Sequence, residues 1–212
     1  MKIQIISLII LCAQISFSKT EDPDLKKVLS KLRESPLVTF EVEKKTKSEL
    51  LGKETVAPGT IYLASKKFRW DTDGSEKSKI IYDGQTIWTI QEPPKGFKAP
   101  PQITKMKLDK KSESQVFLNS LFQKNFNSQF RLVKTVKIDQ DWDFYLKPLQ
   151  KNLGVEELKI KVDAKNQLKE ISYSDEIQNK IIIAVNKTTL SKKSNAKLFQ
   201  FKPPTGAQVN EL

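Results

Sequence analysis

The 212-residue chain contains no histidine and a single cysteine, Cys12. The absence of histidine removes the side chain that most often serves as a general base near neutral pH and as a ligand for transition metals. One cysteine can form neither an intrachain disulfide nor a cysteine-based metal cluster. The sequence also lacks a P-loop, a dinucleotide-binding fingerprint and zinc-ligand spacing. We therefore predict a non-catalytic protein that uses no metal or organic cofactor.

The only long apolar run lies at the N-terminus, from Ile3 to Leu11. Ser16 and Ser18 follow it and supply the small residues that favour signal-peptide cleavage before Lys19. The run is too short to span a bilayer, and no later stretch approaches about 18 apolar residues. The sequence thus predicts a secretory signal peptide over residues 1–18 and export to the periplasm.

Cys12 allows a second interpretation of the N-terminus. A lipoprotein signal places a cysteine behind a small residue, whereas the bulky Leu11 precedes this one. We favour removal of Cys12 with the signal peptide, which leaves a single domain over residues 19–212. Lipidation of Cys12 is the alternative and would tether the protein to a membrane.

Acidic residues are scarce relative to basic ones, with 25 Asp and Glu against 37 Lys and Arg, a formal charge of +12. A basic protein can associate with nucleic acid, an anionic membrane surface or an acidic partner protein. The lysines are spread along the chain and accompany no nucleic-acid-binding motif. We predict no nucleic-acid partner and interpret the charge as an aid to solubility and to partner docking.

Two segments have helical patterns. Pro23 follows the candidate N-cap Asp22, and Pro36 ends the first helix. The apolar face of this helix consists of Leu25, Val28, Leu29 and Leu32. The second helix is predicted from Ser112 to about Lys124, with Ser112 and Gln115 as a capping-box pair.

Most of the remaining chain shows the two-residue alternation of half-buried strands. The predicted strands are 38–42, 60–64, 67–70, 79–82, 86–90, 130–138, 142–146, 157–162, 168–173, 180–185 and 198–201. Four of the ten prolines fall within residues 92–101, which predicts a loop. About ten or eleven strands with few helices indicate a mainly β (α+β) fold, an antiparallel meander that curls around its helices and leaves an apolar concavity.

Four motifs occur in a characteristic order. They are Gly59-Thr-Ile-Tyr-Leu, Phe68-Arg-Trp70, Tyr82-Asp-Gly-Gln-Thr-Ile-Trp88, and Phe199-Gln-Phe201-Lys-Pro-Pro-Thr-Gly-Ala-Gln-Val209. This succession resembles the LolA-type outer-membrane lipoprotein carriers of Gram-negative bacteria. The resemblance implies an incomplete β-barrel with a helical lid and a cavity for lipoprotein acyl chains. It also implies two partners, an inner-membrane lipoprotein-releasing ABC transporter and an outer-membrane receptor.

One feature of that family is missing. Many carriers have an Arg-Pro pair, thought to hold the lid closed, where this chain has Ala64-Ser-Lys-Lys67. A lysine here could substitute, but a flexible ammonium does not reproduce the planar fork of a guanidinium. The resemblance therefore supplies no latch for the lid of this chain.

Apolar side chains that share a strand face are the candidates for lipid binding. We predict that the cavity is lined by Phe40, Tyr62, Phe68, Trp70, Ile80, Tyr82, Trp88 and Ile90. The predicted lid consists of Val116, Phe117, Leu118, Leu121 and Phe122. The same residues could form an ordinary filled core, as in a periplasmic binding or sensor module without lipid. We favour a monomeric lipoprotein carrier over that module and over a membrane-tethered acceptor of the same fold.

Overall fold

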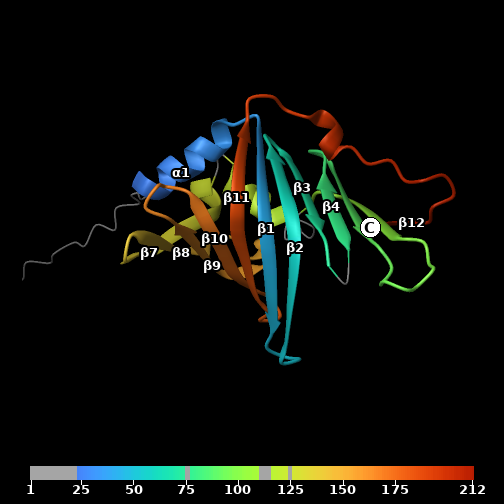
Figure 1. Cartoon of the computed structure of the whole chain (residues 1–212), viewed down its shortest axis with the longest axis horizontal. Helices are drawn as coiled ribbons and strands as arrows, with labels where there is room; N and C mark the ends of the chain where they lie inside the picture. The colour runs from blue at the N-terminus through green and yellow to red at the C-terminus, as the bar shows by residue number, and fades with distance from the viewer. Residues whose placement is uncertain (1–22, 75–76, 110–115, 124–125) are drawn as a thin grey trace, which may run out of the picture.

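A single curled sheet of twelve strands forms most of the protein, as the computed structural model in Figure 1 shows. The structure describes residues 23–74, 77–109, 116–123 and 126–212. The strand order is β12-β6-β5-β4-β3-β2-β1-β11-β10-β9-β8-β7, and only the β12–β6 pair is parallel. The sheet does not close on itself, which confirms the predicted mainly β fold and incomplete barrel.

The strands are β1 (Leu37–Ser48), β2 (Lys53–Ala64), β3 (Lys67–Thr72), β4 (Ser78–Tyr82), β5 (Thr86–Gln91), β6 (Gln102–Lys107), β7 (Phe130–Ile138), β8 (Asp141–Pro148), β9 (Val155–Val162), β10 (Leu168–Asp175), β11 (Lys180–Ser191) and β12 (Val209–Glu211). The helices are α1 (Pro23–Glu34), α2 (Phe117–Leu121) and α3 (Phe126–Gln129), with 3-10 turns η2 (Lys151–Leu153) and η3 (Ala196–Phe199). Helix α1 buries the four apolar residues that its periodicity predicted. The second predicted helix is described only in part, because residues 110–115 lie outside the described residues, as do the predicted signal peptide and Cys12.

The two faces of the sheet are covered to different extents. The inner face carries the main apolar cluster, to which α1, α2 and most strands contribute. Part of the outer face is covered by the chain that follows β11, in one cluster around Phe199 on β1 and β2 and another around Ile103 on β4 to β6. Because both faces of β6 are buried, its apolar residues do not alternate and the strand was not predicted. Ile103 is buried on the outer face and Met106 on the inner face.

The segment 198–201 is not a strand, contrary to the prediction. Residues 196–199 form the 3-10 turn η3, in which the Asn195 side chain accepts a hydrogen bond from the Lys197 N–H at 3.2 Å. Consecutive apolar residues such as Leu198 and Phe199 do not alternate, and both contribute to the outer cluster. The true last strand is β12, whose three residues are too few for a periodicity signal.

Gly59 marks a close approach between β2 and β3. A Cβ at this position would lie 2.6 Å from the Asp71 carbonyl oxygen and 3.2 Å from Trp70 Nε1. We predict that Gly59→Ala forces the two strands apart and lowers the free energy of unfolding by about 1–3 kcal/mol. In a thermal melt this corresponds to a drop of about 2–4 °C per kcal/mol.

Gly74→Ala is the matched control for this variant, because its added Cβ would meet Ala57 at an ordinary 3.4 Å. An unchanged melting temperature for Gly59→Ala, relative to this control, would contradict the packing argument.

Candidate functional site

Helix α2 lies inside the curl of the sheet, against its inner face. Four of its residues, Phe117, Leu118, Asn119 and Leu121, are buried. The ring of Phe122, just beyond its end, lies 5.8 Å from that of Phe40 on β1. The ring of Phe117 packs edge-to-face on Tyr173 of β10 at 4.5 Å. This burial raises the pKa of the Tyr173 hydroxyl above its usual range.

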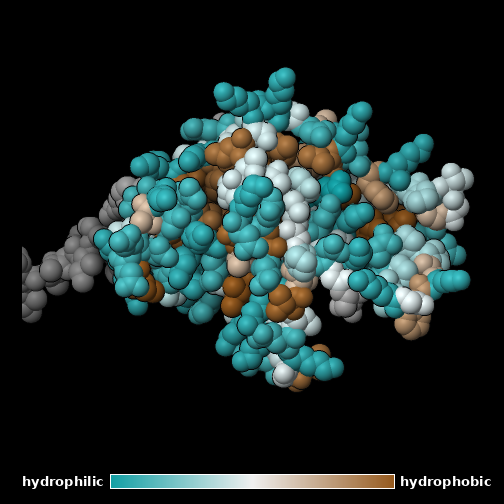
Figure 2. All heavy atoms as spheres, viewed as in Figure 1, coloured by the Kyte–Doolittle hydropathy of each residue, from teal (hydrophilic) through white to brown (hydrophobic). Residues whose placement is uncertain are grey.

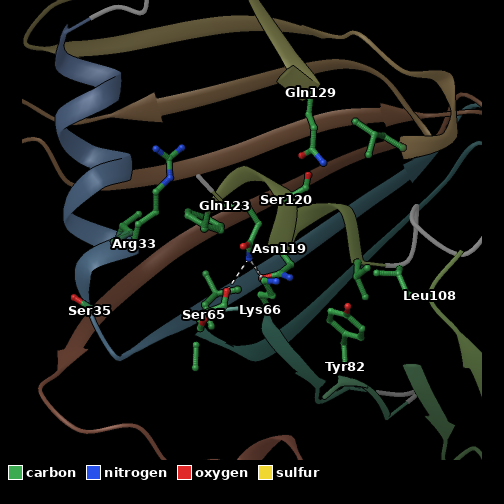
Figure 3. Close-up of a pocket in the computed structure, with 16 residues that line it drawn as sticks. Arg33, Ser35, Ser65, Lys66, Tyr82, Leu108, Asn119, Ser120, Gln123 and Gln129 are labelled. Atoms are coloured by element: carbon green, nitrogen blue, oxygen red, sulfur yellow. Dashed lines mark hydrogen bonds between the residues drawn. The ribbon is translucent and has the colours of Figure 1, made fainter. Parts of the chain in front are cut away.

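A pocket of about 630 Å³ opens beside α2, between the end of α1 and the β2–β3 turn (Figure 3). Its lining is mixed. The apolar lining comes from Leu32, Leu63, Ala64, Tyr82, Leu108, Val116, Phe122 and Leu153, and the polar lining from Arg33, Ser35, Ser65, Lys66, Asn119, Ser120, Gln123 and Gln129. The apolar side suits a hydrocarbon chain, and the polar side suits the ester or amide groups to which such a chain is attached.

Polar groups surround the mouth of this pocket. The Arg33 guanidinium lies over the Phe126 ring, 5.7 Å from its centroid. The Gln129 Oε1 atom is buried without a hydrogen-bond partner among the described residues. In Figure 3 the Gln129 side chain extends from the end of α3 towards α2. A buried acceptor of this kind favours a ligand that brings a donor.

A hydrogen bond ties α2 to the β2–β3 turn. The Gln123 Nε2 atom donates to the Ser65 carbonyl oxygen at 2.7 Å and to Asn119 Oδ1 at 3.0 Å (Figure 3). Ser65 belongs to the turn where the sequence lacks Arg-Pro. At this turn the structure thus shows a different contact, in which the side-chain amide of Gln123, just after α2, donates to a main-chain carbonyl.

A second pocket, of about 420 Å³, lies near the other end of the inner face. It is lined by Lys44, Thr46, Phe117, Gly154, Tyr173, Asp175, Glu176, Ile177, Asn179 and Ile181. The Lys44 ammonium lies over the Trp70 ring, 5.2 Å from its centroid, and burial lowers the Lys44 pKa. Residues 116–123 therefore contribute to both pockets, Phe117 to this one and Phe122 to the larger one.

The structure places five of the predicted cavity residues on the inner face, namely Phe40, Phe68, Trp70, Ile80 and Tyr82. Of these, only Tyr82 lines the larger pocket. All five predicted lid residues, Val116, Phe117, Leu118, Leu121 and Phe122, are buried in the same cluster.

The other three predicted cavity residues lie on the outer face, so the structure does not bring them together with the first five. Tyr62 packs in the cluster around Phe199, while Trp88 and Ile90 pack in the cluster around Ile103. The Trp88 ring meets Phe201 edge-to-face at 5.3 Å. The physical reason is that the outer face is also apolar here, because residues 192–208, between β11 and β12, cover it. We call these residues the C-terminal segment.

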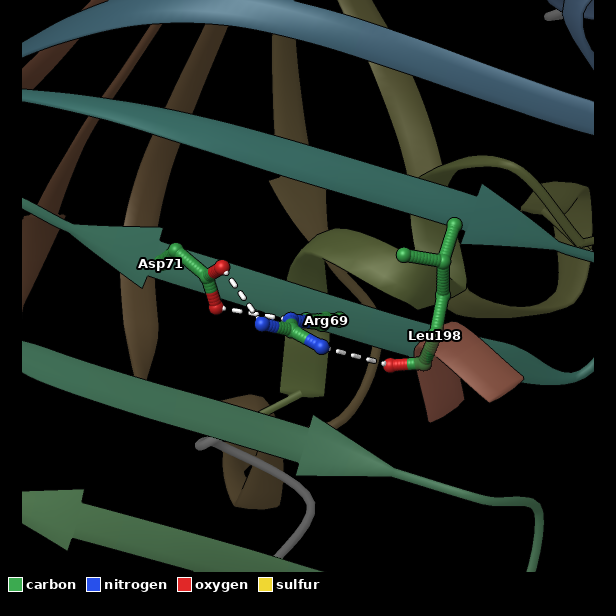
Figure 4. A network of polar contacts seen from close by, with 3 residues as sticks. All are labelled: Arg69, Asp71 and Leu198. Atoms are coloured by element: carbon green, nitrogen blue, oxygen red, sulfur yellow. Dashed lines mark hydrogen bonds and ion pairs between the residues drawn. The ribbon is translucent and has the colours of Figure 1, made fainter. Parts of the chain in front are cut away.

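Arg69 fastens that segment to the sheet (Figure 4). Its guanidinium donates two hydrogen bonds to the Asp71 carboxylate, at 2.8 and 2.7 Å, and a third to the Leu198 carbonyl oxygen at 3.0 Å. The fork-shaped pairing raises the Arg69 pKa. The Phe-Arg-Trp and Phe-x-Phe motifs thus act together in holding the C-terminal segment in place.

Several pocket residues were missed by the sequence analysis. Leu32 was assigned to a helix face but not to the pocket, and Leu63 shares an inner face with Ile61. Arg33, Asn119 and Gln129 carry no signal in the sequence, because isolated polar residues near helix ends are common on protein surfaces. Only their convergence in three dimensions distinguishes them.

The family model for the outer membrane lipoprotein carrier protein LolA matches residues 39–202. The chain belongs to the LolA family. Comparison with curated proteins finds no significant match. An uncharacterized conserved protein from Thermus thermophilus has the same fold, with a TM-score of 0.51 and 13% identity over 89% of this chain and 98% of that one.

Two further solved structures are similar at lower TM-scores. A putative outer membrane lipoprotein-sorting protein domain from Vibrio parahaemolyticus gives 0.43, with 9% identity over 83% of this chain and 94% of the other. A LolA superfamily protein from Nitrosomonas europaea gives 0.42, with 11% identity over 84% and 97%.

LolA-family members are periplasmic, and the family is one of binding and chaperone proteins. No helix among the described residues has the length and apolar character needed to cross a bilayer. Over the same residues, no group of three or more acidic or sulfur side chains is placed to hold a metal ion.

Proposed function

We propose that this LolA-family protein is a periplasmic carrier that shelters the acyl chains of lipoproteins against the inner face of its sheet. The single observation that carries the proposal is the position of α2. This short helix and Phe122 behind it fill the concavity with apolar side chains, and pockets open on both sides of them. An element that occupies the site and is itself only five residues long is suited to being displaced by cargo.

Acyl chains need apolar area and shape rather than catalytic groups. Burial of one methylene group contributes about 0.8 kcal/mol, so a chain of ordinary length binds strongly to a dry cavity. Release is then the harder step. Because cargo must displace α2, part of the gross binding energy is offset, and cargo remains transferable.

The transfer route is part of the same proposal. The protein would accept lipoproteins from an inner-membrane ABC transporter and deliver them to an outer-membrane receptor, as a monomer cut before Lys19. Its formal charge of +12 favours acidic docking surfaces on those partners.

Purification of the exported chain from its native host tests this function directly. We expect lipidated proteins to co-purify and to be released by detergent, and the mass of the N-terminus to correspond to a start at Lys19. A diacylated Cys12 would instead indicate the tethered acceptor. Absence of bound lipid, together with no uptake of an apolar fluorescent probe, would contradict the carrier function.

Gln123→Ala tests the fastening of α2. Loss of the bond to the Ser65 carbonyl removes about 0.5–1.5 kcal/mol from the closed state. The apparent affinity for an apolar fluorescent probe should therefore rise about 2- to 10-fold. A fluorescence titration measures the change, and Gln85→Ala, on the exposed β4–β5 turn, is the matched control. An affinity that stays the same or falls would show that Gln123 does not hold the site closed.

A further inference from the structure

Four of the five most exposed large apolar residues in the described part of the chain lie on turns at one end of the sheet, and the fifth is Leu212. Leu50 and Leu51, at the tip of the β1–β2 hairpin, are 87% and 67% exposed. Phe97, in the β5–β6 loop, and Ile177, in the β10–β11 turn, are each 72% exposed. We call these three turns, residues 49–52, 92–101 and 176–179, the docking end.

The strand register places the three turns at the same end. Lys47 pairs with Lys180, so the β1–β2 and β10–β11 turns are neighbours, and Lys180 Nζ lies 3.1 Å from Glu49 Oε1. From β2 to β5 each pair of neighbouring strands is antiparallel, so the start of β2 and the end of β5 lie at the same end of the sheet. In Figure 1 the β1–β2 hairpin projects below the rest of the sheet, and Figure 2 shows hydrophobic residues at its tip.

Lysines accompany every apolar tip. Lys47 and Lys53 flank the two leucines, Lys95 and Lys98 flank Phe97, and Lys180 follows Ile177. Counting Lys44 and Lys45, the three turns and their flanks carry seven lysines. The five carboxylates nearby are Glu49, Glu54, Glu92, Asp175 and Glu176.

Most of these carboxylates already have partners. Glu49 pairs with Lys180, and Glu54 pairs with Lys45 at 2.8 Å. The Asp175 carboxylate accepts hydrogen bonds from the Ile177 and Asn179 N–H groups within its own turn. The same pairs occupy Lys45 and Lys180, so the positive charge of the docking end is the excess of seven lysines over five carboxylates.

We propose that the docking end inserts its apolar tips into the surface of an anionic lipid bilayer. The apolar residues are separate points on three turns rather than one contiguous patch, so a protein partner would need a shaped recess for each. A bilayer surface needs no shaped recess, because separate apolar side chains can insert at any position on it. The flanking lysines can extend their ammonium groups to the lipid headgroups. Isolated exposed apolar residues are common, but here four of the five most exposed share one end of the sheet, each with lysines beside it.

The smaller of the two pockets reaches the docking end. Ile177 lines the smaller pocket, which reaches Phe117 of α2 and the main apolar cluster. Docking here would present this opening to the hydrocarbon of the membrane. The proposal goes beyond acyl-chain carriage, because membrane binding by the tips needs neither cargo nor a displaced α2.

Cosedimentation of the chain without residues 1–18 with vesicles of phosphatidylcholine and phosphatidylglycerol tests the proposal. We expect binding, and a loss of about ten-fold or more in the double variant Leu50→Ser, Leu51→Ser, because two leucine side chains no longer leave water. Ile138→Ser is the matched control, since Ile138 is an exposed aliphatic residue on the β7–β8 turn at the opposite end of the sheet. A polarity-sensitive fluorophore attached through Leu51→Cys should also shift its emission to the blue on vesicles.

Three outcomes would overturn the proposal. They are no vesicle binding by the unmodified chain, equal binding by the double variant, and equal loss in Ile138→Ser. If vesicle binding is absent but the double variant still impairs cargo delivery, the tips contact a protein instead. Titration of the same proteins with an apolar probe reports acyl-chain binding separately, so failure of docking and failure of carriage are distinguishable.

Discussion

Replacement of Phe122 by alanine is expected to tighten acyl-chain binding by about 100-fold or more. Phe122 packs on Phe40 and lines the larger pocket, so it stabilises the state in which α2 fills the concavity. Truncation of a buried phenylalanine costs about 3–5 kcal/mol, and here the cost falls on the closed state that cargo must displace. Because apparent affinity scales with the fraction of open molecules, a weaker closed state binds more tightly.

Phe40→Ala supplies the control, because it removes the other half of the same ring pair. Phe40 lies on β1, in the middle of the sheet, between β2 and β11. Its truncation should lower the free energy of unfolding of the whole domain by about 3–5 kcal/mol, in denaturant titrations followed by tryptophan fluorescence. Phe122→Ala should lower the free energy of unfolding by about 3 kcal/mol, because it weakens the closed ground state, but it should also raise probe affinity in the fluorescence titration.

These expectations would fail in a recognisable way if α2 were ordinary core. Phe122→Ala would then behave like Phe40→Ala, with a large loss of global stability and no gain in affinity. Hydrogen exchange separates the two cases further, since a displaceable α2 should exchange faster than β1 in the unmodified protein and faster still in Phe122→Ala.

Periodicity predicted the fold well where one face of an element is buried. The four apolar residues of α1 and the alternation of Val38, Phe40 and Val42 correspond to observed burial. Periodicity failed where both faces are buried, as in β6, and where an element is too short, as in β12. It also could not show that β1 extends to Ser48 or that β2 begins at Lys53, because the far half of β1 has no apolar residues and the far half of β2 has no alternation.

The candidate site was less accessible from the sequence than the fold. The face of a strand follows from alternation, but which face is inner does not, and so Tyr62, Trp88 and Ile90 were grouped with residues that lie on the opposite face. The polar lining of the larger pocket depends on contacts between distant segments, such as Gln123 with Ser65. No local pattern encodes those contacts.

Trp88→Ala is expected to lower the free energy of unfolding by about 3 kcal/mol and to leave acyl-chain binding unchanged. The Trp88 ring packs on Phe201, and the Lys105 ammonium lies 5.9 Å from its centroid, all on the outer face. Without the indole, the C-terminal segment loses its main contact with β5. Denaturant titration measures the stability, and limited proteolysis should show faster cleavage in residues 200–208.

Phe201→Ala is the natural partner variant, since it removes the other ring of the same contact. The two single losses should not add in the double variant, because either substitution alone already breaks the pair. Arg69 would still hold the Leu198 carbonyl in all three proteins, so the segment should loosen from Phe201 onward before it detaches at η3. A markedly weaker probe affinity in Trp88→Ala, with stability unchanged, would place the indole in the acyl-chain site after all, and would mean that the outer face rather than the inner one receives the lipid.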